Sequence, residues 1–441
     1  MVIKFIYGMS GCSKTTTAIK LLKNKLNFDF NCIAFTHSAV NNLKDKYIKM
    51  MTKKQKSIGA TSSWNIESIP NYAFQTIHKF LRIPIDERTG TYTIIRHSSL
   101  KIKSIVIIDE FSLIPLDIIN YLFEIATSTE YMSINFIFVG DFIQLQPIST
   151  ISQPINLNLL KSDFSNITLN FNQAIRIADH LSNSVYTTKY FKESKKLILN
   201  HNYRNGTNII NILNDVLDNY NFKKYIISNY DIKKYVEDGY VVLSSMYKHL
   251  EMAYTFAIPQ NKIKGDGYIY KTKIGNIKIS KGDRFILNEN VDIDFVNGDE
   301  VEIINLLDTE NKVEIRKYVN KDKNSSENSF RNEKSVDATS ARNDNLNKDN
   351  EINEKDVSIV IPASKLIPYN FITCHKAQGK TIPKVLLILD DLFEITMLYT
   401  AITRASEDVK FIKFKYLPDK SDIEAFKIMR NVIYFTQHNE E

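Results

Sequence analysis

Short apolar runs alternate with stretches of helical period along the first half of the chain. The apolar runs predict strands at Val2–Tyr7, Asn31–Thr36, Ile102–Ile108 and Ile134–Val139. Stretches such as Thr15–Leu26 and Leu116–Thr127 have the period of helices and separate the strands. Because strands that alternate with helices usually connect in parallel, we expect an α/β domain over residues 1–200.

The same pattern returns in the second half of the chain. Apolar runs at Tyr240–Ser245 and Val385–Leu389 predict strands of a second α/β domain over residues 201–441. Between them, Lys281–Leu287 and Asn297–Ile303 are typical of short antiparallel strands with Asn-Gly turn chemistry. We therefore expect a small β-rich, SH3-like subdomain inserted at residues 267–368.

The stretch from Lys321 to Lys355 differs from the rest of the chain. It consists mostly of Asn, Ser, Asp, Glu and Lys, and Phe330 is its only aromatic residue. Such a segment buries too little apolar surface to offset the entropy lost on ordering. We predict a disordered surface loop inside the inserted subdomain.

Composition excludes several classes of protein. The chain has 441 residues, of which 43% are hydrophobic, and a formal net charge of +7, which is compatible with a polyanionic partner. Cys12, Cys32 and Cys374 form no C-x-x-C pair, so we expect reduced thiols rather than a zinc site or disulfides.

No apolar run reaches the roughly 18 residues of a membrane span, and no signal peptide is visible. We expect a soluble protein that acts inside a cell, in the cytoplasm or nucleus. The abundance of Asn, Ile and Lys suggests an AT-rich coding genome, as in viruses and parasites.

A glycine- and serine-containing turn lies between the first predicted strand and the first predicted helix. This is the context of a phosphate-binding loop, in which backbone N–H groups at a helix start face phosphate oxygens. Lys14 would reach the terminal phosphates of ATP, and the Thr15 hydroxyl would ligate Mg²⁺. The predicted nucleotide-binding residues of this segment are Gly8, Gly11, Ser13, Lys14, Thr15 and Thr16.

Polar residues follow the next two central strands. Asp109 and Glu110 end the run Ile105–Ile108, where ligands of open α/β sheets bind. Asp109 would hold Mg²⁺, and Glu110 would orient and deprotonate an attacking water. Gln144, in the loop after the fourth strand, would contact the terminal phosphate.

Taken in order, these segments resemble the motifs of superfamily 1 helicases, most closely the RecD- and Dda-like group. The resemblance rests on Gly8–Thr16, Ala34–Ala39, Gln75–Phe80, Asp109–Ser112, Gly140–Pro147, Asn202–Arg204, Thr373–Gly379 and Tyr399–Ala405. Each segment alone is a weak signal, whereas eight in the family's order form a strong one. The resemblance implies two RecA-like P-loop NTPase domains with the nucleotide between them.

The resemblance also implies roles for individual residues. Arg204 and Arg404, from the second domain, would surround the γ-phosphate together with Gln144, and Gly379 would belong to the nucleotide site. Two guanidinium groups stabilise the transferring phosphoryl group when the cleft closes.

A second set of motif residues would line the path of a single nucleic-acid strand. These residues are Thr36, His37, Thr76, His78, Thr373, His375 and Lys376. Small hydroxyls and backbone amides hold phosphates without reading sequence. Phe80 or Trp64 would be available to stack on a base, although core packing is the commoner role of such residues.

Two departures from the family's pattern concern the nucleotide. Ser13 occupies the position before Lys14, where the family usually has glycine. No segment precedes Gly8 that could hold the glutamine with which the family often contacts adenine. We therefore expect lower nucleotide affinity and acceptance of several nucleoside triphosphates.

The sequence favours an ATP-dependent helicase that translocates on single-stranded DNA with 5′→3′ polarity, in replication, repair or recombination. An RNA helicase of the same superfamily is the main alternative. A decayed ATPase that only binds single strands and a P-loop kinase are further alternatives. The set Lys14, Asp109, Glu110, Arg204 and Arg404 is intact, which argues against decay.

Overall fold

The computed structural model describes most of the chain and divides it into two compact units. The described residues are 2–23, 28–57, 69–86, 91–97, 99–147, 154–257, 267–292, 295–307, 310–318, 357–390, 394–413, 417 and 419–435. Unit 1 comprises Met1–Pro259 and Asn370–Glu441, and unit 2 comprises Gln260–Tyr369. The predicted loop Lys321–Lys355 and Trp64 lie outside the described residues.

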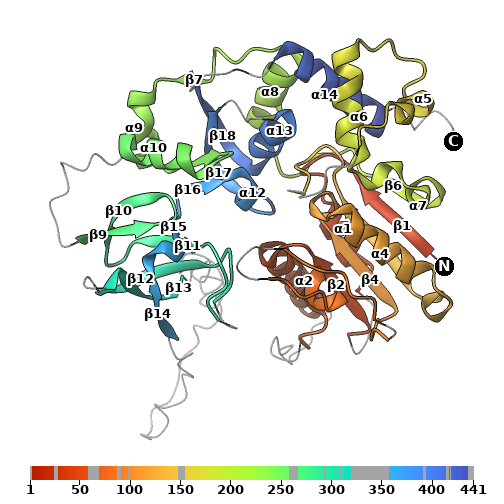
Figure 1. The fold of residues 1–441 in the computed structure, drawn as a ribbon, viewed down its shortest axis with the longest axis horizontal. Helices are drawn as coiled ribbons and strands as arrows, with labels where there is room; N and C mark the ends of the chain where they lie inside the picture. Colours follow the sequence, from red (N-terminus) through yellow and green to blue (C-terminus); the bar gives the residue numbers. More distant parts are fainter. Residues whose placement is uncertain are drawn as a thin grey trace, which may run out of the picture. The chain divides into compact units, whose positions relative to one another are not determined.

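The first half of unit 1 contains a six-stranded parallel sheet (Figure 1). Its strands run in the order β3 (Phe74–Thr76), β2 (Phe30–Ala34), β4 (Ile105–Asp109), β5 (Asn135–Gly140), β1 (Val2–Tyr7) and β6 (Lys195–Ile198). All neighbouring strands pair in parallel. The carboxyl ends of β1, β4 and β5 therefore meet at one edge of the sheet, which is the edge expected to bind ligands.

Helices cover both faces of this sheet, which explains its continuous apolar runs. On one face, Ile137 and Val139 of β5 join a core with residues of α1 (Lys14–Lys20) and α2 (His37–Ser57). On the other face, Phe138 packs against Phe123 of α4 (Leu116–Thr127) at 5.1 Å between ring centroids. The side chains of β5 thus alternate between two buried faces, as the period of a strand requires.

Three further helices of this half follow β5 along the chain. They are α5 (Leu160–Asp163), α6 (Phe171–Ser182) and α7 (Lys189–Glu193). A capping box formed by Asn170 and Gln173 begins α6, which packs against α14 (Lys420–Tyr434) near the carboxyl end of the chain. The C-terminal helix is thereby tied to the first half of unit 1.

A five-stranded parallel sheet forms the second half of unit 1. Its order is β16 (Phe371–Thr373), β8 (Tyr240–Ser244), β17 (Ile382–Leu389), β18 (Ala405–Lys413) and β7 (Ile226–Ile227). The helices with it are α8 (Thr207–Leu213), α9 (Ile232–Glu237), α10 (Tyr247–Ala257), α12 (Cys374–Ala377) and α13 (Ile395–Arg404). The helix α8 packs on β18, and α13 packs on β17 and β18.

Unit 2 is built from antiparallel strands. A hairpin pairs β9 (Gly267–Thr272) with β10 (Gly275–Ser280). A five-stranded sheet has the order β14 (Ser358–Pro362), β13 (Lys312–Lys317), β12 (Glu300–Leu307), β11 (Arg284–Leu287) and β15 (Leu366–Pro368). The turn that enters β12 contains Gly298 at φ 95°, a conformation that glycine adopts without strain. The antiparallel strands and the Asn-Gly turn of this region agree with the sequence pattern.

Within the described ranges, none of the helices combines the length and the apolar character needed to cross a membrane. The three cysteines are buried and unbridged.

Candidate nucleotide site and strand path

The loop between β1 and α1 curls around the end of the Lys14 side chain. The Lys14 ammonium donates hydrogen bonds to the carbonyl oxygens of Gly8 at 2.9 Å and Met9 at 2.8 Å. Ser13 begins α1 with φ 58° in the left-handed region, and its side chain makes no capping hydrogen bond. A non-glycine residue pays roughly 1–2 kcal/mol for this conformation. The departure noted in the sequence therefore lies at a position where glycine would be relaxed.

Two glycines of this loop lie against the segment that follows β6. A Cβ atom on Gly8 would lie 2.1 Å from the carbonyl oxygen of Leu199, and one on Gly11 would lie 2.2 Å from Oδ1 of Asn202. The Tyr203 N–H donates to the Gly11 carbonyl at 2.9 Å. The glycines are thus required by close backbone approach, and this approach fixes the segment that carries Arg204.

The carboxyl end of β4 places Asp109 beside the helix start. The Thr15 hydroxyl donates to Asp109 Oδ2 at 3.1 Å, and Asp109 is 3% exposed. Burial, followed by the charge of Glu110, raises the pKa of Asp109 to about 6, while Lys46 and Thr15 oppose the rise. The carboxylate therefore lacks enough positive partners in the protein itself.

The oxygen atoms of Thr15 and Asp109 fit a magnesium ion. Mg²⁺ is usually held by one or two carboxylates together with waters and substrate phosphates, rather than by a cage of protein ligands. The raised pKa of Asp109 points the same way, because an undercompensated buried carboxylate is stabilised by a cation.

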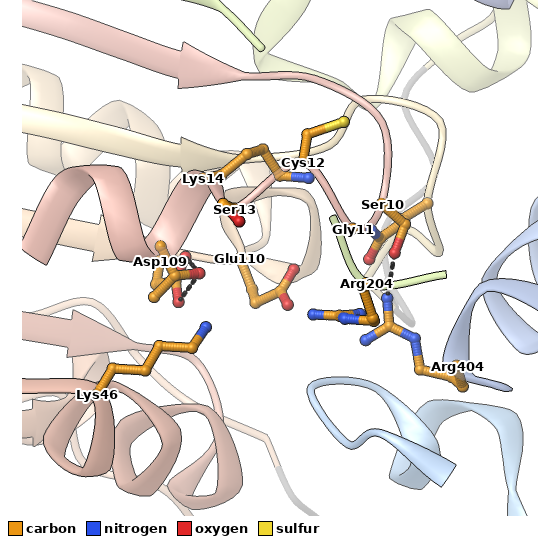
Figure 2. A pocket seen from close by; sticks show the side chains of 12 residues that line it. Ser10, Gly11, Cys12, Ser13, Lys14, Lys46, Asp109, Glu110, Arg204 and Arg404 are labelled. Carbon is orange, nitrogen blue, oxygen red and sulfur yellow. Dashed lines mark hydrogen bonds between the residues drawn. The ribbon is translucent and has the colours of Figure 1, made fainter. Parts of the chain in front are cut away.

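The guanidinium groups of Arg204 and Arg404 lie on the side of Glu110 that is opposite Asp109 (Figure 2). Arg404 ends α13, is 1% exposed, and donates from Nη2 to Ser10 Oγ at 2.9 Å. Burial, then repulsion from Arg204, lowers the pKa of Arg404 to about 10. Among the described residues, Arg404 Nε, Arg404 Nη1 and Arg204 Nη1 are buried without a hydrogen-bond acceptor. Such unsatisfied donors are costly unless an anion binds them.

A buried network around Asp141 positions Gln144. Asp141, which follows β5, is fully buried and accepts hydrogen bonds from the hydroxyls of Tyr399 and Tyr434 and from the Gln144 amide. The Tyr399 hydroxyl also accepts from the Ser10 N–H at 2.8 Å. The network thus joins the phosphate loop and the loop after β5 to the helices α13 and α14 in one set of contacts.

One cavity brings most of the predicted nucleotide residues together. Its lining contains Ser10, Gly11, Cys12, Ser13, Lys14, Thr15, Lys46, Asp109, Glu110, Gln144, Arg204 and Arg404. All six predicted catalytic residues are in this set. Gly8, Thr16 and Gly379, which the sequence also assigned to the nucleotide, do not line it. Lys46 was missed by the sequence reasoning, because its place depends on the course of α2.

An exposed aromatic side chain lies next to the loop. Tyr203 has 70% of its surface exposed, and its ring contacts that of His201 at 4.4 Å between centroids. Its backbone bond to Gly11 ties it to the loop. The sequence interpretation used Tyr203 only as part of a motif and assigned it no role.

Three predicted strand-path threonines share one local structure. Thr36, Thr76 and Thr373 each lie where a strand of a parallel sheet gives way to a helix. Their hydroxyls accept from the N–H groups of Ala39, Lys79 and Lys376, respectively. The helix starts beside them present backbone N–H groups of the kind that phosphates bind.

The predicted strand-path histidines differ in surroundings. His37 begins α2. His78 is 9% exposed and packs against the rings of Phe35 and Tyr92, and burial lowers its pKa. Burial also lowers the pKa of His375, which lies with Lys376 in α12. Phe80 is buried, so its ring packs in the core.

Comparisons with known proteins identify the fold. Residues 2–150 match a family described as an AAA domain, whereas no curated protein matches the sequence significantly. A Pif1 helicase structure, described with DNA unwinding at forked duplex DNA, has a TM-score of 0.52, 16% identity, and coverage of 96% of this chain and 92% of that chain. The Bacteroides Pif1 helicase with ADP-AlF3 and single-stranded DNA has a TM-score of 0.51, 19% identity, and coverage of 96% and 90%. The Candida albicans Pif1 helicase has a TM-score of 0.50, 16% identity, and coverage of 97% and 94%.

These likenesses confirm the predicted fold class. The chain has the fold of the Pif1 helicases, with two RecA-like domains. The antiparallel sheet of unit 2 fits the predicted SH3-like insertion.

Proposed function

We propose that this chain, which has the fold of superfamily 1 helicases, is an ATP-dependent motor that moves along single-stranded DNA and unwinds duplexes. The observation that carries the proposal is the convergence of side chains from both RecA-like halves on one cavity. Lys14 and Asp109 come from the first half, Arg404 comes from the second, and Arg204 comes from the segment between β6 and α8. A site built in this way changes when the halves move relative to each other, which a motor requires.

The cavity suits hydrolysis of a nucleoside triphosphate. A water attacks the γ-phosphorus, the bond to the β,γ-bridging oxygen breaks, and ADP leaves with that oxygen. Glu110 accepts the proton of the water. Arg204 and Arg404 stabilise charge on the transferring phosphoryl group, and Gln144 contacts its oxygens. The buried guanidinium donors without acceptors are suited to these oxygens.

Thr15 and Asp109 would hold the magnesium ion of the nucleotide. When bound, Mg²⁺ neutralises charge on the phosphate oxygens. Lys14 releases the Gly8 and Met9 carbonyls and donates to the terminal phosphates instead. Gly8 belongs to the phosphate loop and Thr16 to α1, and Gly379 is proposed for this site from its motif; none of the three lines the cavity.

Tyr203 supplies a surface for the base. Its exposed ring lies one residue from Arg204 and is tied to the phosphate loop through Gly11. Stacking on an aromatic ring accepts every base, because each base has a π-face. Several nucleoside triphosphates are therefore expected as substrates.

The strand path runs along the helix starts at the carboxyl ends of strands in both parallel sheets. Thr36 and Thr76 belong to the first sheet, and Thr373 belongs to the second. Together with His37, His78, His375 and Lys376, they bind the backbone of the strand and read no sequence. Each half holds the strand with a different affinity in the open and closed states, so the ATP cycle moves the strand in one direction.

DNA is the favoured substrate, with 5′→3′ polarity as the motif set implies and with replication, repair or recombination as the setting. Two of the similar Pif1 structures are described with single-stranded DNA or forked duplex DNA. Strand displacement on DNA and RNA duplexes with either 5′ or 3′ overhangs tests both points. Unwinding of the 5′-overhang DNA duplex is expected, and unwinding of RNA alone would assign the chain to the RNA helicases.

Replacement of Lys14 tests the site itself. Lys14→Ala is expected to abolish the ATP hydrolysis that single strands stimulate, measured as phosphate release with and without oligonucleotide. Full activity in this variant would refute the site assignment. Strand binding without any hydrolysis by the natural chain would instead identify a binding module.

A further inference from the structure

Lys46 reaches the nucleotide cavity from an element that none of the nucleotide-site motifs includes. It lies in α2, nine residues after His37, and its side chain lines the cavity with Asp109 and Glu110. Figure 2 shows the Lys46 side chain extending from its helix toward the space beside Asp109, on the side opposite Lys14. The cavity is therefore approached by cations from three directions: from the phosphate loop, from the arginine pair and from α2.

The Lys46 ammonium is held in this cavity without a direct partner. Within the described ranges it makes no hydrogen bond, and no carboxylate lies within 4 Å of it in an ion pair. Burial lowers the pKa of Lys46, although the charges of Asp109 and Glu110 oppose that change. Partial burial of an ammonium group without a partner costs free energy, which a bound anion recovers.

The charges of the residues that line the cavity favour the binding of an anion. Four cationic side chains, Lys14, Lys46, Arg204 and Arg404, line the cavity, together with the two carboxylates of Asp109 and Glu110. The excess is positive, and a magnesium-bound nucleoside triphosphate is negative. Once Asp109 ligates a cation, its carboxylate attracts Lys46 less, and the terminal phosphate becomes the nearest uncompensated anion.

We propose that Lys46 is a ligand of the γ-phosphate, which it contacts from the face opposite the phosphate loop. The inference rests on the proposed nucleotide site and adds a residue to it. Lys46 has a long, flexible stem and three donors, so its ammonium reaches a phosphate oxygen without a fixed geometry. It therefore distinguishes ATP from ADP by contacting the one phosphate that ADP lacks.

The position of Lys46 also connects the two predicted sites. At about 1.5 Å per residue, Lys46 lies roughly 14 Å along α2 from His37, where the helix begins beside the strand-path residue Thr36. A shift of this one helix on strand binding moves the ammonium relative to the γ-phosphate. The proposal thus gives strand-stimulated hydrolysis a rigid element that touches both ligands.

The test compares the affinities of Lys46 variants for two nucleotides. Fluorescence titration with Mg²⁺ measures binding of a non-hydrolysable ATP analogue and of ADP to the full chain. Lys46→Met is expected to weaken the ATP analogue about tenfold and to leave ADP unchanged, since a charge-assisted hydrogen bond to the γ-phosphate is lost. Lys46→Arg should retain most of the difference between the two nucleotides.

Matched controls make the outcome decisive. Lys49→Met changes an exposed lysine of the same helix and is expected to alter neither affinity. Thermal unfolding of Lys46→Met should show a melting temperature at or above that of the natural chain, because the variant removes a partly buried charge that has no direct partner. Equal weakening of ADP and the ATP analogue would overturn the proposal and make Lys46 a counter-ion of the metal site. No weakening of either nucleotide would overturn it as well.

Failure of this inference is distinguishable from failure of the proposed function. Binding of the ATP analogue to the natural chain and strand-stimulated phosphate release test the nucleotide site alone. The ratio of ATP-analogue to ADP affinity in Lys46→Met tests the role of Lys46 alone.

Discussion

Two buried carboxylates lie at corresponding places in the two parallel sheets, and their surroundings differ. Asp109 ends β4 and Asp390 follows β17; each strand is third from an edge of its sheet, and each residue is 3% exposed. Asp109 has the Thr15 hydroxyl and a second carboxylate beside it. Asp390 accepts from two serine hydroxyls and contacts His249 Nδ1 at 2.8 Å.

The difference indicates that Asp390 stabilises the fold, whereas Asp109 is suited to binding a ligand. A buried carboxylate with several donors stabilises its surroundings, because its desolvation is offset by hydrogen bonds. Asp109 lacks that compensation, and its raised pKa records the cost. Equal burial at the same place in the same kind of sheet therefore does not imply an equal role; the partners decide it.

The largest expected effect is a loss of kcat on replacing an arginine of the nucleotide cavity, compared with an arginine that is paired elsewhere in the fold. Arg404→Gln should lower kcat for strand-stimulated ATP hydrolysis by on the order of 10³, since a guanidinium at the transferring phosphoryl group is worth at least this much. Steady-state phosphate release measures it. Arg430→Gln is the matched control: Arg430 pairs with Asp218 at 2.8 Å, so its loss should lower stability and leave kcat nearly unchanged. Equal kcat losses in the two variants would contradict the contrast.

Asp109→Asn should lower hydrolysis by about 100-fold or more, because the metal site loses its charge.

The same variant should stabilise the unliganded protein. The raised pKa of Asp109 means that the folded state disfavours the carboxylate, so the cost is full above pH 6 and disappears as the pH falls below the ordinary value near 4. The free energy of unfolding of the variant should be higher than that of the natural chain by about 1–3 kcal/mol at pH 7.5, seen as a higher melting temperature, and should not differ near pH 4. A lower melting temperature at pH 7.5 would argue that Asp109 is already satisfied.

Asp390→Asn should have the opposite profile. The side chain loses charge-assisted hydrogen bonds within a buried cluster, so the free energy of unfolding should fall by about 1–3 kcal/mol. Hydrolysis by the folded protein should stay within about twofold of the natural chain, since Asp390 is not among the residues that line the nucleotide cavity. Chemical denaturation and phosphate release measure the two quantities. A loss of hydrolysis without a loss of stability would remove the distinction between the carboxylates.

Tyr203→Ala should raise KM about tenfold for ATP and for GTP alike, because stacking contributes roughly 1–3 kcal/mol per base. Initial rates over a range of each nucleotide measure it. Tyr203→Phe is the control and should keep the natural KM, since only the ring face is used. A rise for ATP alone would show that Tyr203 reads the identity of the base.

The smallest expected effect concerns the loop itself. Ser13→Gly removes the left-handed strain at φ 58° but adds freedom to the unfolded chain, for a net gain of about 0.5 kcal/mol in stability. Nucleotide affinity should rise about two- to threefold, because glycine lets the loop backbone approach the phosphates more closely in the bound state. Denaturation and nucleotide titration check both values. A clear loss of affinity would show instead that the Ser13 hydroxyl binds phosphate.

The phosphate loop, the acidic pair and both arginines were predictable because each belongs to a short segment at a strand or helix end. Lys14 follows a predicted strand and opens a predicted helix, and Asp109 ends an apolar run. For such residues, local sequence fixes position along an element, and the parallel sheet then brings the strand ends together.

Contacts between distant residues could not be predicted in this way. Lys46 reaches the cavity only because α2 is helical without interruption from His37 past Lys46. The sequence interpretation assigned no helix to this region. The Asp141 network joins residues 258 and 293 positions apart, which no local pattern encodes. The surroundings of His78 are a further example: its motif gave its place along the chain, but not its packing between the rings of Phe35 and Tyr92.

If both RecA-like halves bind one triphosphate, a structure of the chain with Mg²⁺ and ADP–aluminium fluoride will show it. We expect the guanidinium groups of Arg204 and Arg404 and the ammonium group of Lys14 all to lie within hydrogen-bonding distance of the fluoride group that replaces the γ-phosphate. A nucleotide bound by Lys14 and Thr15, with both arginines turned away from it, would show that the second half takes no part in binding.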